Sequence, residues 1–393
     1  MTGLYLHIPF CAAICHYCNF NRGLLDAGLK RRYVAALTRE IRSGNTGLPS
    51  TPLGPGKPRA TPAADTIYFG GGTPSLLDPG EIAAVLAACR EAFDVDAEAE
   101  ITMEANPETV TPDRLAGYRA AGVNRVSFGV QSFRDAELRR LGRLHDAARA
   151  RDAFAEARLA GFDNISLDLM LWLPGQTLAD LRVSVDALVA LQPEHASLYL
   201  LEIHPNAPLE DEMARAGWSQ APDDDAADMY LETMARLESA GYDQYEISNV
   251  ARPGRQSRHN LKYWTDGEWL GFGCGAHSTV GHERWDNVPS TSEYISRVEH
   301  GASPVSGRRM LSPREHLEEA LFMELRLTEG IRLDRIRHDY GVDVWQRWGA
   351  RLEIFEEAGL LEHDEHRLRL TRRGMLLANN VMTTFLEDGS TVK

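Results

Sequence analysis

The feature that most constrains the fold of this chain is a repeated alternation of short apolar runs and longer segments with helical spacing. The apolar runs, which we expect to be strands, cover residues 4–8, 66–69, 100–103, 125–130, 164–171 and 196–203. The helical segments between them cover residues 30–42, 79–93, 112–121, 134–160 and 178–191. Regular alternation of this kind predicts an α/β fold with a parallel sheet, which right-handed crossovers curl into an open or partial barrel.

The second half of the chain departs from this pattern. We expect a helix over 224–240, an extended run over 243–250 and a loop over 252–287. Helices over 315–327, 333–340, 344–358 and 373–385, with a hairpin over 361–370, predict a mostly helical, winged-helix-like domain. At this length two or three domains are typical. We place the barrel at 1–205, a barrel extension at 206–300 and the C-terminal domain at 301–393, with a flexible Pro/Gly/Thr-rich loop at 44–64.

The composition excludes several classes of protein. The 57 Asp and Glu residues exceed the 42 Lys and Arg residues, for a net charge of −15. A broad basic surface for nucleic acid or anionic lipid is therefore not expected. No apolar run approaches the ~18 residues that indicate a membrane span. The beginning, MTGLYLHIPFC, lacks the basic and apolar regions of a secretory signal, so we expect a cytoplasmic protein.

Three of the five cysteines form a CxxxCxxC motif directly after the first expected strand, at Cys11, Cys15 and Cys18. Three thiolates on one short loop can bind three irons of a [4Fe–4S] cluster and leave the fourth iron open. Zinc is the alternative, but zinc sites usually combine two such cysteine pairs. Cys89 and Cys274 are isolated in the sequence, so the iron–sulfur interpretation is favoured.

This motif, with an aromatic residue before its last cysteine, resembles the signature of the radical S-adenosylmethionine (SAM) family. In that family the open iron binds the amino and carboxylate groups of SAM, and the reduced cluster cleaves SAM to a 5′-deoxyadenosyl radical. The glycine run Gly70–Gly72 after the second strand is similar to the family's GGE-type motif. The resemblance implies a partial (β/α)6 barrel and a SAM site formed by Tyr5, Tyr17, Gly71, Gly72, Thr73, Glu104, Gln131, Arg143 and Asp168.

The sequences HIPFC at residues 7–11 and FGGGTPS at 69–75 are similar to the branch of oxygen-independent coproporphyrinogen dehydrogenases and heme chaperones. The dehydrogenases carry CxxxCxxCxC and usually an N-terminal extension. Here Cys18 is followed by Asn19 and Phe20, and Tyr5 lies almost at the beginning. Both features favour the heme chaperones, whose HNxxYW motif resembles His259, Asn260, Tyr263 and Trp264.

This resemblance implies heme as a ligand and acceptor hemoproteins as partners, whereas the acidic charge balance argues against nucleic acid. His259 or His277 could bind iron through a neutral imidazole, and Cys274 through a thiolate. Tyr263 and Trp264 offer flat faces for a macrocycle, although they could equally pack over the barrel mouth. A homodimer and peripheral membrane association through partners are further expectations.

Two enzymatic alternatives stay open at this point. One is oxidative decarboxylation of coproporphyrinogen III. The other is a methyltransferase or cyclopropanase that uses a second SAM, bound by Tyr17, Gly72, Thr73 and Gln131. Trp172 replaces a small residue that is typical of the family, and this substitution leaves the shape of the substrate cavity open.

Overall fold

The computed structural model describes residues 1–43, 62–204 and 207–386. Within these ranges the main feature is a 12-stranded sheet with the order β14-β13-β12-β11-β1-β4-β5-β6-β7-β8-β10-β9. Its central strands, each parallel to the next, are β1 (Thr2–Ile8), β4 (Ala63–Gly71), β5 (Asp94–Ala105), β6 (Arg125–Gln131), β7 (Ile165–Leu171) and β8 (His195–Leu200). The predicted partial (β/α)6 barrel is confirmed.

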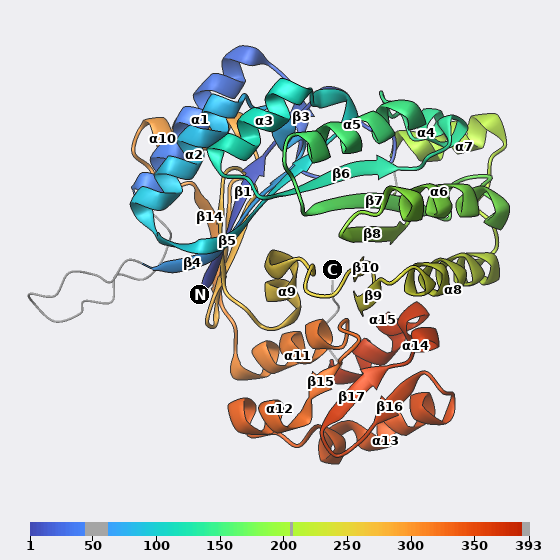
Figure 1. The fold of residues 1–393 in the computed structure, drawn as a ribbon. Coiled ribbons are helices and arrows are strands. Elements are labelled where there is room, and N and C mark those ends of the chain that lie inside the picture. Colours follow the sequence, from blue (N-terminus) through green and yellow to red (C-terminus); the bar gives the residue numbers. More distant parts are fainter. Residues whose placement is uncertain (44–61, 205–206, 387–393) are drawn as a thin grey trace, which may run out of the picture.

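The helices that connect these strands cover the convex side of the sheet (Figure 1). They are α1 (Ala27–Arg42), α2 (Pro79–Ala92), α3 (Pro112–Ala121), α4 (Asp135–Arg140), α5 (Ala147–Leu159) and α6 (Leu178–Leu191). The single helix expected over 134–160 is wrong. Gly142 adopts φ +68°, and Asp146 begins a new helix by accepting a hydrogen bond from the Arg149 N–H at 2.8 Å. Both features end one helix and start another.

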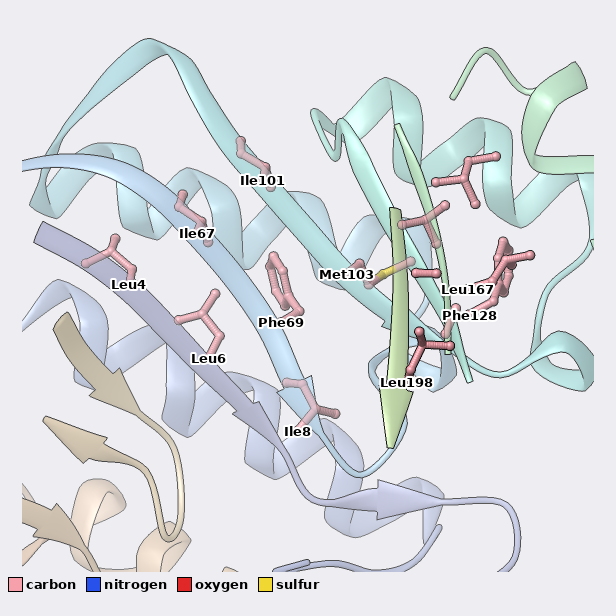
Figure 2. Close-up of a cluster of buried hydrophobic side chains, with 14 of the residues drawn as sticks. Leu4, Leu6, Ile8, Ile67, Phe69, Ile101, Met103, Phe128, Leu167 and Leu198 are labelled. Atoms are coloured by element: carbon pink, nitrogen blue, oxygen red, sulfur yellow. The ribbon is translucent and has the colours of Figure 1, made fainter. Parts of the chain in front are cut away.

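The two faces of the parallel strands differ in chemistry because successive side chains point to opposite faces. Leu4, Leu6 and Ile8 on β1 are fully buried, as are Ile67 and Phe69 on β4. Figure 2 shows these side chains in rows along neighbouring strands, within the core between the sheet and its outer helices. The intervening positions face the barrel interior and are largely polar, including Tyr68, Glu104, Arg125, Asp168 and His195. An interior of this kind suits a polar ligand.

Both edges of the sheet carry additional strands. On one side, β9 (Asp243–Glu246) and β10 (Asn249–Ala251) extend the sheet from β8. On the other, β11 (Trp269–Phe272) pairs in parallel with β1 and leads to β12 (His277–Val280), β13 (Glu283–Asn287) and β14 (Val305–Met310). The loop expected over 252–287 is therefore wrong. It contains these strands and α9 (Arg258–Trp264), which lies on the concave side of the sheet (Figure 1).

Besides α9, three more helices lie between β8 and the C-terminal part in the described ranges. These are α7 (Pro208–Ala216), α8 (Asp223–Ser239) and α10 (Thr291–Glu299). Most of the loop expected at 44–64 lies outside the described residues, and its last residues belong to β4 instead. Among the described residues, no helix is both long and apolar enough to span a membrane.

The C-terminal part combines helices with a small antiparallel sheet of the order β15-β17-β16. Its elements are α11 (Pro313–Glu324), β15 (Ile331–Arg332), α12 (Leu333–Tyr340), α13 (Val344–Glu357), β16 (Leu361–His363), β17 (Arg367–Leu370), α14 (Arg372–Leu376) and α15 (Ala378–Met382). The helix expected over 373–385 is divided. The last strand of the main sheet ends at Met310, beyond the boundary placed at 300, and the three-part division stays a prediction.

Candidate functional site

The cysteine loop follows β1 at the carboxyl end of the barrel strands, where ligand sites of such folds collect. Cys11 belongs to the short strand β2 (Phe10–Cys11) and is buried, whereas Cys15 and Cys18 are partly exposed. The Cys18 N–H donates to the Cys15 carbonyl at 3.2 Å, which tightens the loop. Burial raises the pKa of the Cys11 and Cys18 thiols, so binding of iron there must displace protons.

Two donors reach these sulfurs from other segments of the chain, one after β4 and one between α4 and α5. Arg143 Nη1 lies 3.3 Å from Cys15 Sγ, and Thr73 Oγ1 lies 3.7 Å from Cys11 Sγ. Donors of this kind stabilise thiolate charge. In the described part of the chain, no three Cys, His, Asp or Glu side chains converge tightly enough to hold one metal ion. A [4Fe–4S] cluster binds each thiolate on a separate iron, and the three cysteines of this one loop supply three such ligands.

The loop opens into a cavity of about 420 Å³ at the barrel mouth. Nearly all residues predicted for the cluster and SAM line this cavity: Cys11, Cys15, Tyr17, Cys18, Gly71, Gly72, Thr73, Glu104, Gln131, Arg143 and Asp168. Tyr5 does not line it. Its side chain lies deeper in the interior, where its hydroxyl is 3.1 Å from His7 Nδ1 and its ring stacks on Tyr68.

The glycine turn after β4 permits a close approach of two backbone segments. The Gly72 N–H donates to the Ile8 carbonyl at 2.7 Å. A Cβ on Gly72 would lie 2.7 Å from the Phe10 carbonyl oxygen. Gly71 has φ +112°, a conformation that favours glycine. The turn therefore holds the cysteine loop against the end of β4.

Two partly buried carboxyl groups line the cavity. Glu104 accepts hydrogen bonds from the Tyr68 hydroxyl at 2.8 Å and from the Gly71 N–H at 3.2 Å. Burial raises the pKa of Glu104 to about 7. Asp168 accepts a hydrogen bond from Ser127 Oγ at 3.1 Å, and burial raises its pKa to about 6. Both groups change charge near neutral pH and can accept hydrogen bonds from ribose hydroxyls when ionised.

Arg143 is fixed by residues that sequence reasoning missed. Its Nη2 donates to Asn106 Oδ1 at 2.7 Å and to the Gly129 carbonyl at 2.8 Å. Asn106 Nδ2 in turn donates to Thr73 Oγ1 at 3.2 Å. Asn106 directly follows β5, so its place at a strand end was a signal available in the sequence. Gln131, the last residue of β6, has φ +68°, so the strand ends in a local kink at the cavity wall.

The segment predicted to bind heme lies elsewhere. His259 is buried in the barrel interior, with Nδ1 at 2.8 Å from Thr66 Oγ1 and Nε2 at 3.0 Å from the Tyr263 hydroxyl. Burial lowers the pKa of His259 to about 3, so its imidazole is neutral. Because both ring nitrogens have partners, His259 has none available for iron in this arrangement.

The other three predicted residues of this segment, Asn260, Tyr263 and Trp264, lie in two different places. Asn260 donates its backbone N–H to the Ser257 hydroxyl at 3.3 Å at the beginning of α9. Tyr263 and Trp264 line a separate cleft beside β11. The structure thus brings the predicted cluster and SAM residues together around one cavity and places the predicted heme residues outside it.

Comparison with known proteins agrees with this geometry. Residues 5–188 match the Radical SAM superfamily, and residues 311–377 match the HemN C-terminal domain. The solved structure of coproporphyrinogen III oxidase (HemN) from Escherichia coli superposes with a TM-score of 0.84 at 25% identity, covering 98% of this chain and 89% of that one. The fold and the site define a radical SAM protein, a class that holds a [4Fe–4S] cluster and SAM.

Similarity to curated proteins narrows the class. The chain is 36% identical to the heme chaperone HemW of Bacillus subtilis (strain 168), covering 99% of this chain and 100% of the relative. It is 38% identical to the heme chaperone HemW of Mycobacterium tuberculosis (strain ATCC 25618 / H37Rv), with coverage of 98% and 94%. The chain belongs to the HemW family.

Proposed function

We propose that this protein is a heme chaperone that binds heme and transfers it to acceptor hemoproteins while it carries a SAM-ligated [4Fe–4S] cluster. The observation that carries the proposal is the end-to-end similarity to HemW proteins, together with a cavity that gathers three cysteines and a set of SAM-type polar groups. The cysteines fit a cluster, because their sulfurs face hydrogen-bond donors and open space. When bound, the cluster supplies one-electron chemistry and an open iron for SAM.

The residues around the cavity have distinct tasks in this proposal. Cys11, Cys15 and Cys18 bind the cluster. The carboxylates of Glu104 and Asp168 accept hydrogen bonds from the sugar of SAM, and Arg143 provides positive charge beside Cys15. Tyr17, Gly72, Thr73 and Gln131 line the same cavity.

A second candidate function is oxidation of a porphyrinogen, which the close superposition on HemN favours. HemN-like methyl transfer or cyclopropanation is a third, because the residues for a second SAM lie around one cavity. Against the dehydrogenase, the position two residues after Cys18 is Phe20, which is 65% exposed at the cavity mouth. An apolar, exposed residue there offers no further thiolate.

The test is anaerobic reconstitution of the cluster, followed by addition of SAM and a strong reductant with and without heme. We expect stable heme binding, transfer of heme to an apo-hemoprotein and no conversion of coproporphyrinogen III. Formation of protoporphyrinogen without heme retention would instead identify an oxidative decarboxylase. Measurement of 5′-deoxyadenosine decides whether SAM is turned over.

The cellular setting is also a proposal. We place the protein in the cytoplasm, with heme and acceptor hemoproteins as partners and with membrane contact only through those partners. A homodimer is a separate prediction. Sedimentation of the full chain tests the dimer, and flotation with and without acceptor-containing vesicles tests the membrane contact.

A further inference from the structure

A second large cleft lies between the edge strands of the main sheet and the C-terminal helices. It encloses about 1020 Å³, at the large end of the roughly 300–1,000 Å³ typical of ligand sites. One wall is formed by residues of β11–β14, another by α9 and a third by α11. Figure 1 shows α9 and α11 one below the other beside these strands. The cysteines of the first cavity do not line this cleft.

The cleft has aromatic walls that suit a flat apolar ligand. Tyr263 and Trp269 pack edge to face, with ring centroids 4.7 Å apart. Trp264 lies under the guanidinium of Arg326 at 4.5 Å, and its buried Nε1 has no hydrogen-bond partner among the described residues. Phe322 of α11 contributes a further apolar ring. Aromatic faces of this kind stack on conjugated macrocycles.

One side chain in the cleft is suited to bind heme iron. His277 at the beginning of β12 lines the cleft and is exposed, and its imidazole makes no hydrogen bond or ion pair within the described ranges, although its backbone pairs with β13. It differs in this respect from His259, whose two ring nitrogens are both engaged. Neutral imidazole is a common ligand of heme iron. Met323 of α11 lines the same cleft and adds a thioether, which heme iron also accepts.

The rim offers positive charge for the two heme propionates. Arg309 pairs with Glu315 at 3.3 Å, and their side chains are 64% and 41% exposed. Arg284 pairs with Glu319 at 3.2 Å. Exposed ion pairs contribute little stability, so a propionate can replace the Glu315 carboxylate at Arg309 with little loss. The paired acids leave the empty cleft close to neutral, which suits an apolar macrocycle with acidic groups at one edge.

We propose that this cleft is the heme site and that His277 is the ligand to the heme iron. The inference rests on the proposed function, because it names the site at which that function binds its cargo. It separates heme from the cysteine loop. It also gives Tyr263 and Trp264 the role of a wall, while His259 fixes α9 from the barrel interior.

The experiment compares the full chain with His277→Gly and with His300→Gly as a matched control. His300 is an exposed histidine at the end of α10, outside the cleft. Heme is titrated into each reconstituted protein and followed by its Soret absorption. We expect His277→Gly to lose at least about tenfold in heme affinity, with cluster absorbance and SAM binding unchanged. Added imidazole should restore the wild-type spectrum in this variant, because it can occupy the space left by the side chain.

The outcomes separate this inference from the proposed function. If the wild-type protein binds no heme, the chaperone function itself fails. If the wild-type protein and His277→Gly bind heme with equal affinity and identical spectra, the function stands and this site is wrong. A loss of heme without rescue by imidazole, or an equal loss in His300→Gly, would also overturn the assignment of the ligand.

Discussion

At the scale of single residues, the barrel interior partly shields acidic groups from solvent. Glu104 and Asp168 line the cavity beneath the cysteine loop, and their main contacts are neutral hydroxyl and amide donors. Burial without a paired cation favours the protonated form of a carboxyl group. The charge of the SAM site therefore depends on pH in the physiological range.

This leads to a prediction for SAM binding. Ribose hydroxyls donate best to an ionised carboxylate, and Glu104 becomes ionised as the pH rises through its pKa of about 7. We expect SAM affinity to rise between pH 6 and pH 8, by at most about tenfold per pH unit. Glu104→Gln should bind SAM more weakly at pH 8 and show a flatter profile. Equilibrium measurement of SAM binding across this pH range tests the prediction, and Glu98→Gln, at an exposed position, is the control. If Glu104→Gln shows the same pH profile as wild type, Glu104 is not the group that accepts from SAM.

Glu40 is a further acid, which is buried, does not line the cavity and bears on stability. Glu40 of α1 accepts hydrogen bonds from the Gly273 N–H at 2.9 Å, the Asn287 amide at 2.7 Å and the Tyr294 hydroxyl at 2.5 Å. Burial raises the pKa of Glu40 to about 7. The folded protein therefore holds this proton more tightly than the unfolded chain, whose Glu pKa is about 4.3.

The sign of the resulting pH dependence follows from this difference. The stabilisation from Glu40 is complete below about pH 4.3 and is lost as the pH rises through about 7. We expect wild type to lose stability relative to Glu40→Gln between pH 5 and pH 7.5. The difference between their unfolding free energies should decrease by at most about 1.4 kcal/mol per pH unit. Urea unfolding at several pH values measures it. A constant difference would show that Glu40 does not titrate in this window.

Sequence reading at this scale succeeded where chemistry is local. The CxxxCxxC loop is visible in the chain because its spacing is local, whereas Glu104 and Asp168 were assigned from the resemblance to the radical SAM family. Glu40 was not visible, since its partners are more than 230 positions away in the sequence. The engagement of both His259 nitrogens by Thr66 and Tyr263 is likewise a tertiary contact that the motif does not reveal.

At the scale of elements, the turns and caps of the barrel were predictable, whereas α9 was not. The boundaries of α3 and α6 match the expected ranges because proline, glycine and threonine mark their ends. The seven residues of α9 form too short a helix for a clear apolar period. Its first N–H groups, from Arg258 and His259, donate to the distant Glu100 carboxylate at 3.0 and 3.1 Å. Ser257 caps the helix locally, but this additional cap from Glu100 cannot be read from neighbouring residues.

The glycine turn gives a prediction at this scale. In Gly72→Ala the new Cβ would meet backbone atoms of Ile8 and Phe10 at 2.7–3.0 Å, so the cysteine loop must move. We expect this variant to lose most of its cluster and its SAM affinity. In Gly80→Ala, on α2, the new Cβ meets nothing within 4 Å, and stability should rise by about 0.5 kcal/mol. Iron and sulfide content measures the cluster in Gly72→Ala, and thermal unfolding measures the stability of Gly80→Ala. A full cluster in Gly72→Ala would contradict the close packing of this turn.

At the scale of the whole molecule, the C-terminal part contacts both edges of the main sheet, at β13 through the Arg284–Glu319 ion pair and beside β9 through Ile247 and Glu246. The Ile247 N–H donates to the Arg326 carbonyl at 3.1 Å, and Arg326 also pairs with Glu246 at 3.4 Å. The turn between α9 and β11 contacts the C-terminal helices through Asp266. The sequence indicated a separate C-terminal domain but not this joint, because its partners come from distant segments. The cleft proposed for heme lies at this joint, so its width depends on these contacts.

Asp266 provides the sharpest test of this dependence. Its carboxylate lies 2.9 Å from His316 Nε2 on α11 and accepts a hydrogen bond from the Tyr340 hydroxyl at 2.7 Å on α12. Asp266→Ala leaves both partners without their acceptor in a partly buried place, at a cost of about 1–3 kcal/mol. We expect faster amide hydrogen exchange in α11 and α12 and faster release of bound heme, with exchange in β4–β6 unchanged.

The control Asp364→Ala removes only a local turn contact to His366 and Arg367, and it should alter neither hydrogen exchange in α11 nor heme release. Equal loss of protection throughout the barrel would mean that Asp266 supports the whole fold and not the joint, whereas faster exchange in α11 with unaltered heme release would show that the cleft does not depend on this helix.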